Sequence, residues 1–301
     1  MTAERRGSVR ILRAVVPGVI DQEYTDGWSA FDRGTSPQLI KGLGVARCAC
    51  AVKSFQLARE AGITTHFIEQ VGLRTIRVKE FAVPGHPALS RKTHGRVLPV
   101  EWIWRTEVRG SLWERIRTKE VDPISLGFGS GETITVGSKL PRLLQECTTK
   151  YEKVDRLLSD TEAKILTGLS YQEWGEARKL VEKLVAVTNG YLERLGFRSP
   201  DGKKELGLTH EGQIIPVDVF CTPDENRILH KVTGELYSKD LLRHYLQSQP
   251  WKAELDAAKA AYPDDKDKWP PYPIIPDYLV ELVTARYAEL TLKYAGVPIR
   301  R

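Results

Sequence analysis

The sequence predicts a mixed fold, with short strands concentrated in the first hundred residues and helices in the remainder. Two observations support this prediction. Near the N-terminus, apolar and β-branched runs of strand length alternate with turn residues, a pattern typical of strands. Farther along, the apolar period becomes helical, and capping residues flank the periodic segments. A length of 301 residues suits one large domain or two small ones.

The expected elements follow in chain order. Strands are expected over residues 9–16, 19–25, 64–70, 73–83 and 97–105. The first helix is expected over residues 42–61, because Gly62 then allows a left-handed cap. Further helices are expected over residues 159–195, 238–261 and 277–295, the first of them introduced by the capping-box spacing of Ser159 and Glu162. Residues 264–273 are too rich in proline for a helix, and we expect them to form a linker on the surface.

One hairpin carries the strongest chemical signal. Lys203 and Glu205 are two residues apart, so in a strand their side chains share one face. After a turn, residues 214–217 are expected to form a second strand, which ends at Asp218. Such a hairpin can bring Glu205 and Asp218 together. Two carboxylates beside a lysine suit Mg²⁺ that also holds nucleotide phosphates, although solvated charges on a surface hairpin would give the same pattern.

Two linked motifs in this region resemble the phosphoribosylaminoimidazole-succinocarboxamide (SAICAR) synthetase family. They are Asp201-x-Lys203-x-Glu205-x-Gly207 and Asp218-x-x-x-Thr222-Pro-Asp224-x-x-Arg227, and their internal and mutual spacing fits that family. The resemblance extends over nearly the whole chain, through residues 7–10, 24–34, 62–69, 98–105, 110–112, 146–155, 234–243 and 276–287.

The resemblance implies an α+β fold with two domains. Residues 1–105 would form an N-terminal antiparallel β domain that binds nucleotide, and residues 106–301 an ATP-grasp-like α+β domain with the metal and substrate residues. It also implies an ATP-dependent carbon–nitrogen ligase of de novo purine biosynthesis. Such an enzyme activates carboxyaminoimidazole ribotide as an acyl phosphate and joins it to L-aspartate, giving the succinocarboxamide, ADP and phosphate.

The family's functional residues map onto positions of this sequence. The resemblance implies catalytic roles for Lys203, Asp224 and Arg227, and Mg²⁺ binding by Glu205 and Asp218. The residues that it implies for ATP binding are Gly7, Ser8, Val9, Arg10, Lys79, Glu101 and Lys203. Those that it implies for substrate binding are Arg105, Ser111, Asp224, Arg227, Lys239 and Arg243. ATP and Mg²⁺ are therefore the expected cofactors.

Charge and composition agree with small anionic substrates. The net charge is +6 and the isoelectric point is near 9.0, but basic residues are interleaved with acidic ones and no nucleic-acid-binding motif is present. A positively lined cleft for ATP, ribotide and aspartate explains the surplus. We expect no nucleic-acid or membrane partner, while a homo-oligomer is compatible with the sequence.

Compartment and cysteine usage point to the cytoplasm. No apolar run is long enough to cross a membrane, and the N-terminus has no apolar signal core. The four cysteines, Cys48, Cys50, Cys147 and Cys221, lack zinc-site spacing, so we expect buried free thiols.

Several positions depart from the family pattern. Gly27 stands in place of an arginine, Leu43 in place of a lysine, and Val219 in place of an acidic residue. Lys204 stands where the family usually has phenylalanine. These departures leave an alternative open, a related ligase that acts on another heterocyclic carboxylate in specialised nucleoside metabolism. A nucleotide-binding paralogue without activity is a third alternative, which the joint presence of Lys203, Glu205 and Asp218 disfavours.

Overall fold

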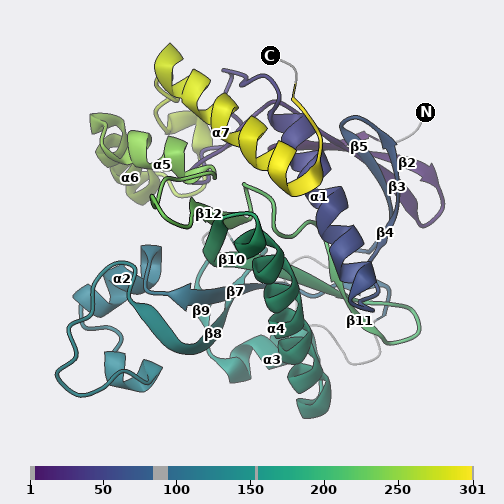
Figure 1. Cartoon of the computed structure of the whole chain (residues 1–301), viewed down its shortest axis with the longest axis horizontal. Helices are drawn as coiled ribbons and strands as arrows, with labels where there is room; N and C mark the ends of the chain where they lie inside the picture. The colour runs from purple at the N-terminus through teal and green to yellow at the C-terminus, as the bar shows by residue number, and fades with distance from the viewer. Residues whose placement is uncertain (1–3, 84–93, 153–154, 300–301) are drawn as a thin grey trace. The chain divides into compact units, whose positions relative to one another are not determined.

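A computed structural model describes residues 4–83, 94–152 and 155–299 of the chain (Figure 1). The chain forms two compact units, which we describe separately. Unit 1 comprises Met1–Glu80, Leu192–Phe197 and Cys221–Arg301, and unit 2 comprises Phe81–Tyr191 and Arg198–Phe220. The chain passes between the two units after residues 80, 191, 197 and 220. The predicted domain boundary after residue 105 stays a prediction.

Unit 1 contains an antiparallel sheet in the order β1-β2-β3-β5-β4. The strands are β1 (Glu4–Arg6), β2 (Arg10–Val16), β3 (Val19–Tyr24), β4 (Phe67–Gly72) and β5 (Thr75–Lys79), with β12 (Asn226–His230) elsewhere in the unit. Its helices are α1 (Leu43–Glu60), α5 (Asp240–Gln247), α6 (Pro250–Ala261) and α7 (Asp277–Ala295). In β3, buried residues alternate with more exposed ones, the period-two pattern of a sheet with one covered face.

Helix α1 is buried on most sides and passes very close to the end of β3. It begins after Gly42, whose φ of 94° is easy only for glycine. A Cβ at Gly44 would lie 2.5 Å from the Tyr24 carbonyl oxygen, so only glycine permits this approach. Ser54 in the same helix lies 3.1 Å from the Tyr294 hydroxyl of α7. These contacts fix α1, and thereby Arg47, against the segment that follows β3.

The proline-rich segment before α7 is packed into unit 1 by its aromatic residues. Trp269 and Ile275 are buried in the apolar core. Tyr272 accepts a hydrogen bond from the Ala30 amide (2.8 Å) and donates one to the Ala30 carbonyl (2.6 Å). The segment is non-helical as predicted, apart from one 3-10 turn at Lys266–Lys268. Residues 264–268 are mostly exposed, as predicted, whereas the prediction of a surface position is wrong for Trp269, whose side chain is buried in the core.

Unit 2 is built on an antiparallel sheet in the order β11-β10-β7-β8-β9, with β6 also paired to β10. The strands are β6 (Arg96–Val97), β7 (Val100–Glu107), β8 (Lys139–Thr149), β9 (Leu157–Leu158), β10 (Phe197–Leu208) and β11 (Ile214–Val217). Helices α2 (Gly110–Arg117), α3 (Asp160–Thr167) and α4 (Tyr171–Arg194) complete it. Trp102 and Trp104 of β7 are fully buried in the core, together with Trp174 and Val181 of α4.

Most predicted elements are present, and the mixed class with antiparallel sheets is confirmed. Ser159 and Glu162 form the predicted capping box at the start of α3. The four cysteines are buried free thiols, as expected. Strand β8 and helix α2 were not predicted. Within the described part of the chain, no helix combines the length and apolar character that crossing a membrane requires.

Candidate active site

The hairpin that carries the predicted metal ligands is confirmed. Strands β10 and β11 are antiparallel, and Glu205 lies opposite Val217. Asp218 is therefore the first residue beyond the pair, beside Glu205. Its backbone is left-handed, with a φ of 57°, which is uncommon for a residue other than glycine. The predicted turn thus places both carboxylates at one end of the hairpin.

Five charged residues form what we call the hairpin cluster: Glu101, Lys150, Lys203, Glu205 and Asp218. They come from four neighbouring strands of unit 2 or the residues directly after them. Lys203 Nζ on β10 lies 2.9 Å from Glu101 Oε1 on β7. Lys150, the residue after β8, forms an ion pair with Glu205. Lys150 lies in a loop that matches the family, but no pattern in the sequence assigns it a role.

Burial and neighbouring charges shift the pKa values in the hairpin cluster. Burial raises the pKa of Glu205 to about 7; Lys150 and Lys203 oppose this rise, whereas Asp218 and Glu101 add to it. Burial alone would lower the pKa of Lys150, but Glu205, Tyr151 and Asp218 together outweigh burial and the pKa is raised. Protons and cations therefore compete for Glu205 near neutral pH.

The hairpin cluster suits a cation that brings ligands of its own. Among residues 4–83, 94–152 and 155–299, no three acidic, histidine or cysteine side chains are arranged to enclose a metal. Mg²⁺ at nucleotide sites is commonly held by one or two carboxylates, with phosphate oxygens and water completing its shell. Glu205 and Asp218 could supply those two carboxylates.

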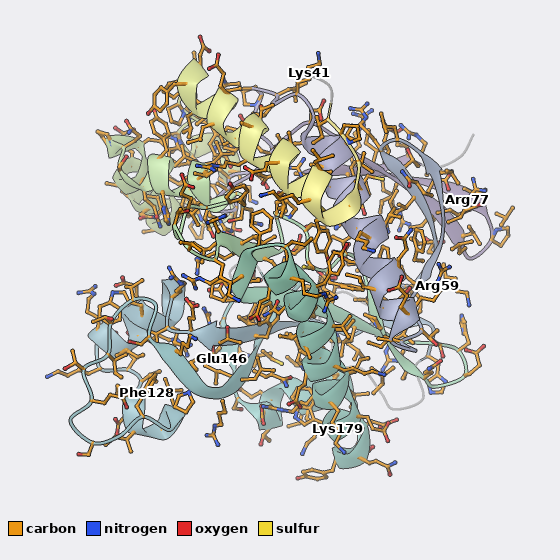
Figure 2. The ribbon with its side chains drawn as sticks, viewed as in Figure 1. Lys41, Arg59, Arg77, Phe128, Glu146 and Lys179 are labelled. Atoms are coloured by element: carbon orange, nitrogen blue, oxygen red, sulfur yellow. The ribbon has the colours of Figure 1, made fainter. Side chains whose placement is uncertain are left out.

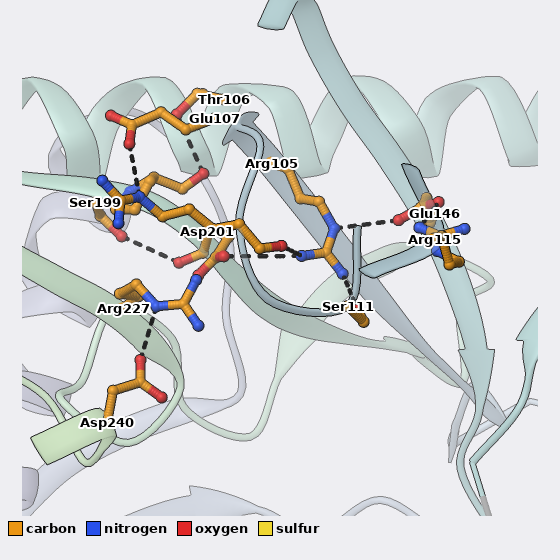
Figure 3. Close-up of polar contacts among 12 residues, drawn as sticks. Arg105, Thr106, Glu107, Ser111, Arg115, Glu146, Ser199, Asp201, Arg227 and Asp240 are labelled. Atoms are coloured by element: carbon orange, nitrogen blue, oxygen red, sulfur yellow. Dashed lines mark hydrogen bonds and ion pairs between the residues drawn. The ribbon is translucent and has the colours of Figure 1, made fainter. Parts of the chain in front are cut away.

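Arg105 lies at the centre of a second polar group in unit 2 (Figure 3). Its guanidinium donates to Glu146 (Nε–Oε2, 3.1 Å) and to the Ser111 hydroxyl (Nη2–Oγ, 2.9 Å), and lies 3.7 Å from Asp201 Oδ2. Arg115 donates to the other Glu146 oxygen at 2.6 Å. Arg105 and Ser111 are thus brought together as predicted, at the start of α2.

Sequence reasoning missed Arg115, Glu146 and Asp201 as members of this group. The i, i+4 spacing of Ser111 and Arg115 would have placed both on one face of α2, had the helix been predicted. Two arginines, a hydroxyl and a helix N-terminus can bind a phosphate, since planar guanidinium groups form paired hydrogen bonds with oxyanions.

In unit 1, Asp224 is largely buried, with 10% of its side chain exposed, and both of its oxygens accept hydrogen bonds. Arg47 Nε donates to Oδ2 at 2.7 Å, and the Tyr287 hydroxyl donates to Oδ1 at 3.0 Å. Burial would raise the pKa of Asp224, but Arg47 and Lys239 outweigh it and hold the pKa below its usual value. Arg47 also donates to the carbonyls of Thr25 (2.7 Å) and Gly27 (2.8 Å). Arg47, which the sequence did not single out, therefore anchors Asp224 in its ionised form.

The other predicted substrate residues of unit 1 gather near the start of α5. Arg227 Nε lies 2.9 Å from Asp240 Oδ2, and Arg243 Nη1 lies 3.4 Å from Asp240 Oδ1. The backbone amide of Lys239 donates to the Pro223 carbonyl at 3.0 Å, next to Asp224. Asp240, absent from the predicted site, thus holds two of the predicted arginines in place.

The predicted nucleotide residues are divided between the units. Gly7, Ser8 and Val9 form the turn between β1 and β2, where the Gly7 amide donates to the Arg10 carbonyl at 2.9 Å. Arg10 Nη1 donates to Gln22 at 3.2 Å. Lys79 ends β5 and is exposed. Glu101 and Lys203 belong to the hairpin cluster of unit 2.

The departures from the family pattern are largely core residues. Leu43 is buried in the apolar core of unit 1, and Val219 is buried beside Asp218. The Gly27 carbonyl is one of the acceptors of Arg47. Lys204 is buried, and its ammonium lies 5.2 Å from the centre of the Trp104 ring. These positions therefore affect packing and buried charge more than they alter the predicted ligands.

Comparison with known proteins identifies the family. The SAICAR synthetase family model matches residues 4–258. Proteins named phosphoribosylaminoimidazole-succinocarboxamide synthase from Thermoplasma acidophilum and Thermoplasma volcanium are each 31% identical to this chain, and the alignments cover 95% of it and 99% of each relative. The relatives' shared name does not favour the alternative of a specialised ligase.

Solved structures agree on the fold. SAICAR synthase from Saccharomyces cerevisiae, in complex with SAICAR, aligns with a TM-score of 0.74 and 19% identity over 100% of this chain and 97% of its own. A SAICAR synthetase in complex with ADP gives a TM-score of 0.72 and 21% identity over 99% and 100%. The match to the family model and the identity with the two Thermoplasma relatives show that the chain belongs to the SAICAR synthetase family, the ATP-dependent ligases of purine biosynthesis.

Proposed function

We propose that this protein joins L-aspartate to carboxyaminoimidazole ribotide with cleavage of ATP, forming SAICAR, ADP and phosphate. The ribotide carboxylate attacks the γ-phosphorus of ATP, and ADP leaves. The aspartate amine then attacks the resulting acyl phosphate, loses a proton and expels phosphate, which leaves the amide. The observation that carries the proposal is the hairpin cluster, since its three carboxylates and two lysines can position Mg-ATP and balance charge while the γ-phosphoryl group passes to the ribotide carboxylate.

In this proposal, Glu205 and Asp218 hold Mg²⁺, which neutralises phosphate charge when bound. Lys203 contacts the phosphates, and Glu101 orients Lys203 through their 2.9 Å ion pair. The family resemblance also implies nucleotide binding for residues 7–10 and Lys79 of unit 1. Positioning and charge neutralisation are the main tasks of a protein in phosphoryl transfer.

The remaining residues bind the two acids. Arg105 and Ser111 bind the ribotide phosphate, with the amide groups at the start of α2 as further donors. Asp224 accepts a hydrogen bond from an amine, as its ionised state allows. Arg227, Lys239 and Arg243 bind carboxylates. A cytoplasmic location and small-molecule partners only belong to the same proposal, which is compatible with a homo-oligomer.

An ADP-release assay tests this function. The protein is incubated with Mg-ATP, carboxyaminoimidazole ribotide and each of a panel of amino acids. We expect ADP release to need both the ribotide and L-aspartate, with kcat/KM of about 10⁴ M⁻¹s⁻¹ or more. ADP release that ignores the ribotide, or that prefers another carboxylate, would reject the proposed substrates.

Arg105→Lys is expected to weaken ribotide use far more than ATP use. Lysine keeps the charge but cannot form the paired hydrogen bonds of a planar guanidinium, and it cannot reach Glu146 and Ser111 together. We expect the ribotide KM to rise about tenfold or more, as the loss of one charge-assisted hydrogen bond implies, while the KM for ATP changes little. The steady-state KM values for the two substrates decide this. Equal rises in both would assign Arg105 a purely structural role.

A further inference from the structure

Lys150 is ion-paired with Glu205, one of the two carboxylates that we propose as metal ligands. Its ammonium group is paired with Glu205, and both side chains are largely buried, with 17% and 9% of their areas exposed. Lys150 follows β8 directly, and Thr149 before it pairs with Val100 of β7, so the backbone is held by the sheet. The ion pair is therefore held in a largely buried position by the sheet, unlike an ion pair between exposed side chains.

Lys150 changes the net charge of the hairpin cluster. Glu205 interacts electrostatically with Lys150, Lys203, Glu101 and Asp218. These groups comprise three carboxylates and two ammonium groups, so the hairpin cluster carries one net negative charge when all are ionised. Without Lys150 the net charge would be two negative charges, which is the more favourable environment for a divalent cation. Because the site is largely buried, the loss of one positive charge at contact distance is expected to raise the affinity for a divalent cation by about tenfold.

From this geometry we propose that Lys150 holds the cation position at Glu205 while no metal is bound, and so sets the metal affinity of the enzyme. Lys150 and a metal ion use the same carboxylate in turn. The ion pair with Lys150 offsets part of the cost of burying Glu205, because an isolated buried carboxylate would be costly. It also weakens the binding of metal that arrives without nucleotide. This inference rests on the proposed role of Glu205 and Asp218 as metal ligands.

The ring of the neighbouring residue Tyr151 lies close to this ion pair. The Lys150 ammonium lies 5.5 Å from the centre of the Tyr151 ring. Burial raises the pKa of the Tyr151 hydroxyl, and the charges of Glu205 and Asp218 add to that rise, opposed by Lys150.

Direct measurement of Mn²⁺ binding, with Mn²⁺ as the probe for Mg²⁺, tests the proposal. Free Mn²⁺ is quantified by electron paramagnetic resonance in titrations of the full chain without nucleotide, at pH 8.5, where competition by protons for Glu205 is reduced. Lys150→Met is expected to bind Mn²⁺ about tenfold more tightly than the wild type. Lys150→Arg keeps the charge and should bind Mn²⁺ as weakly as the wild type.

Lys179 provides the matched control, because it is an exposed lysine of α4 in the same unit (Figure 2). Lys179→Met removes the same charge and should leave Mn²⁺ binding within about twofold of wild type, since solvent screens an exposed charge. Circular dichroism establishes that each variant is folded. In the wild type, acetylation of Lys150 followed by mass spectrometry should also accelerate when Mn²⁺ is added, while acetylation of Lys179 should not.

The outcomes separate this inference from the proposed metal site. Tighter binding by Lys150→Met that disappears in the double variant with Asp218→Asn supports both. A folded Lys150→Met variant that binds Mn²⁺ no better than the wild type overturns the role of Lys150. If Lys150→Met misfolds, an unchanged acetylation rate of wild-type Lys150 at saturating Mn²⁺ overturns it equally. Absence of Mn²⁺ binding in every variant, with and without ADP, overturns the metal site itself.

Discussion

Asp218→Asn is expected to lower kcat/KM by about 10²-fold or more at a fixed, low Mg²⁺ concentration. The substitution keeps the size of the side chain but removes one of the two charges proposed to hold the metal. It leaves Glu205 in place opposite Val217, so the hairpin should persist. The measurement is initial-rate ADP release across a Mg²⁺ titration, and part of the loss should be recovered at high Mg²⁺.

Glu182→Gln is a suitable control, because Glu182 is an exposed carboxylate of α4 in the same unit. We expect it to leave the Mg²⁺ dependence unchanged. Wild-type turnover by Asp218→Asn at every Mg²⁺ concentration would mean that Asp218 is not a metal ligand. A uniform loss with no dependence on Mg²⁺ would point instead to a structural role for its left-handed backbone position.

Arg47→Met is expected to reduce the free energy of unfolding by about 3–5 kcal/mol at neutral pH, because it leaves a buried carboxylate without its charge partner. The destabilisation should depend on pH, and the pKa of Asp224 gives the direction of that dependence. The pKa of Asp224 is lowered in the folded protein, so its contribution is present above its unfolded pKa of about 3.9. That contribution is lost as the pH falls through the folded pKa. The difference between wild type and variant should therefore shrink in acid, as measured by urea unfolding at several pH values.

Arg59→Met is the matched control, because Arg59 is an exposed arginine near the end of the same helix (Figure 2). We expect it to change the free energy of unfolding by less than about 0.5 kcal/mol. Arg47→Lys should fall between the two, since it keeps the charge but cannot reach Asp224 and the carbonyls of Thr25 and Gly27 together. A destabilisation by Arg47→Met that stays the same from pH 7 to pH values well below about 3.9 would assign the loss to packing alone.

Local patterns in the sequence determined the elements and the main hairpin. The capping box of Ser159 and Glu162, and the period-two alternation of Lys203 and Glu205, depend on residues close in the chain. A turn fixes the register of a short hairpin, so the spacing alone places Asp218 beside Glu205. The linked motifs extend this interpretation to a family, and comparison with known proteins confirms the family.

The sequence did not reveal the strands and charges that meet through distant parts of the chain. Strand β8 has exposed and half-buried residues along much of its length, without the clear alternation that identifies a strand. Its pairing with β7 nevertheless brings Lys150 to Glu205 and Glu146 to Arg105. Both ion pairs join residues more than forty positions apart in the chain.

The sequence by itself therefore determined the family, the hairpin and the types of residue available for the chemistry. Only the tertiary structure decided which charges balance one another. Arg47 illustrates the reason: an arginine on a helix is normally solvated, and only the burial of α1 beside Asp224 makes it a structural counter-charge. Pairing energies between buried charges depend on distance and burial, and neither is encoded in spacing along the chain.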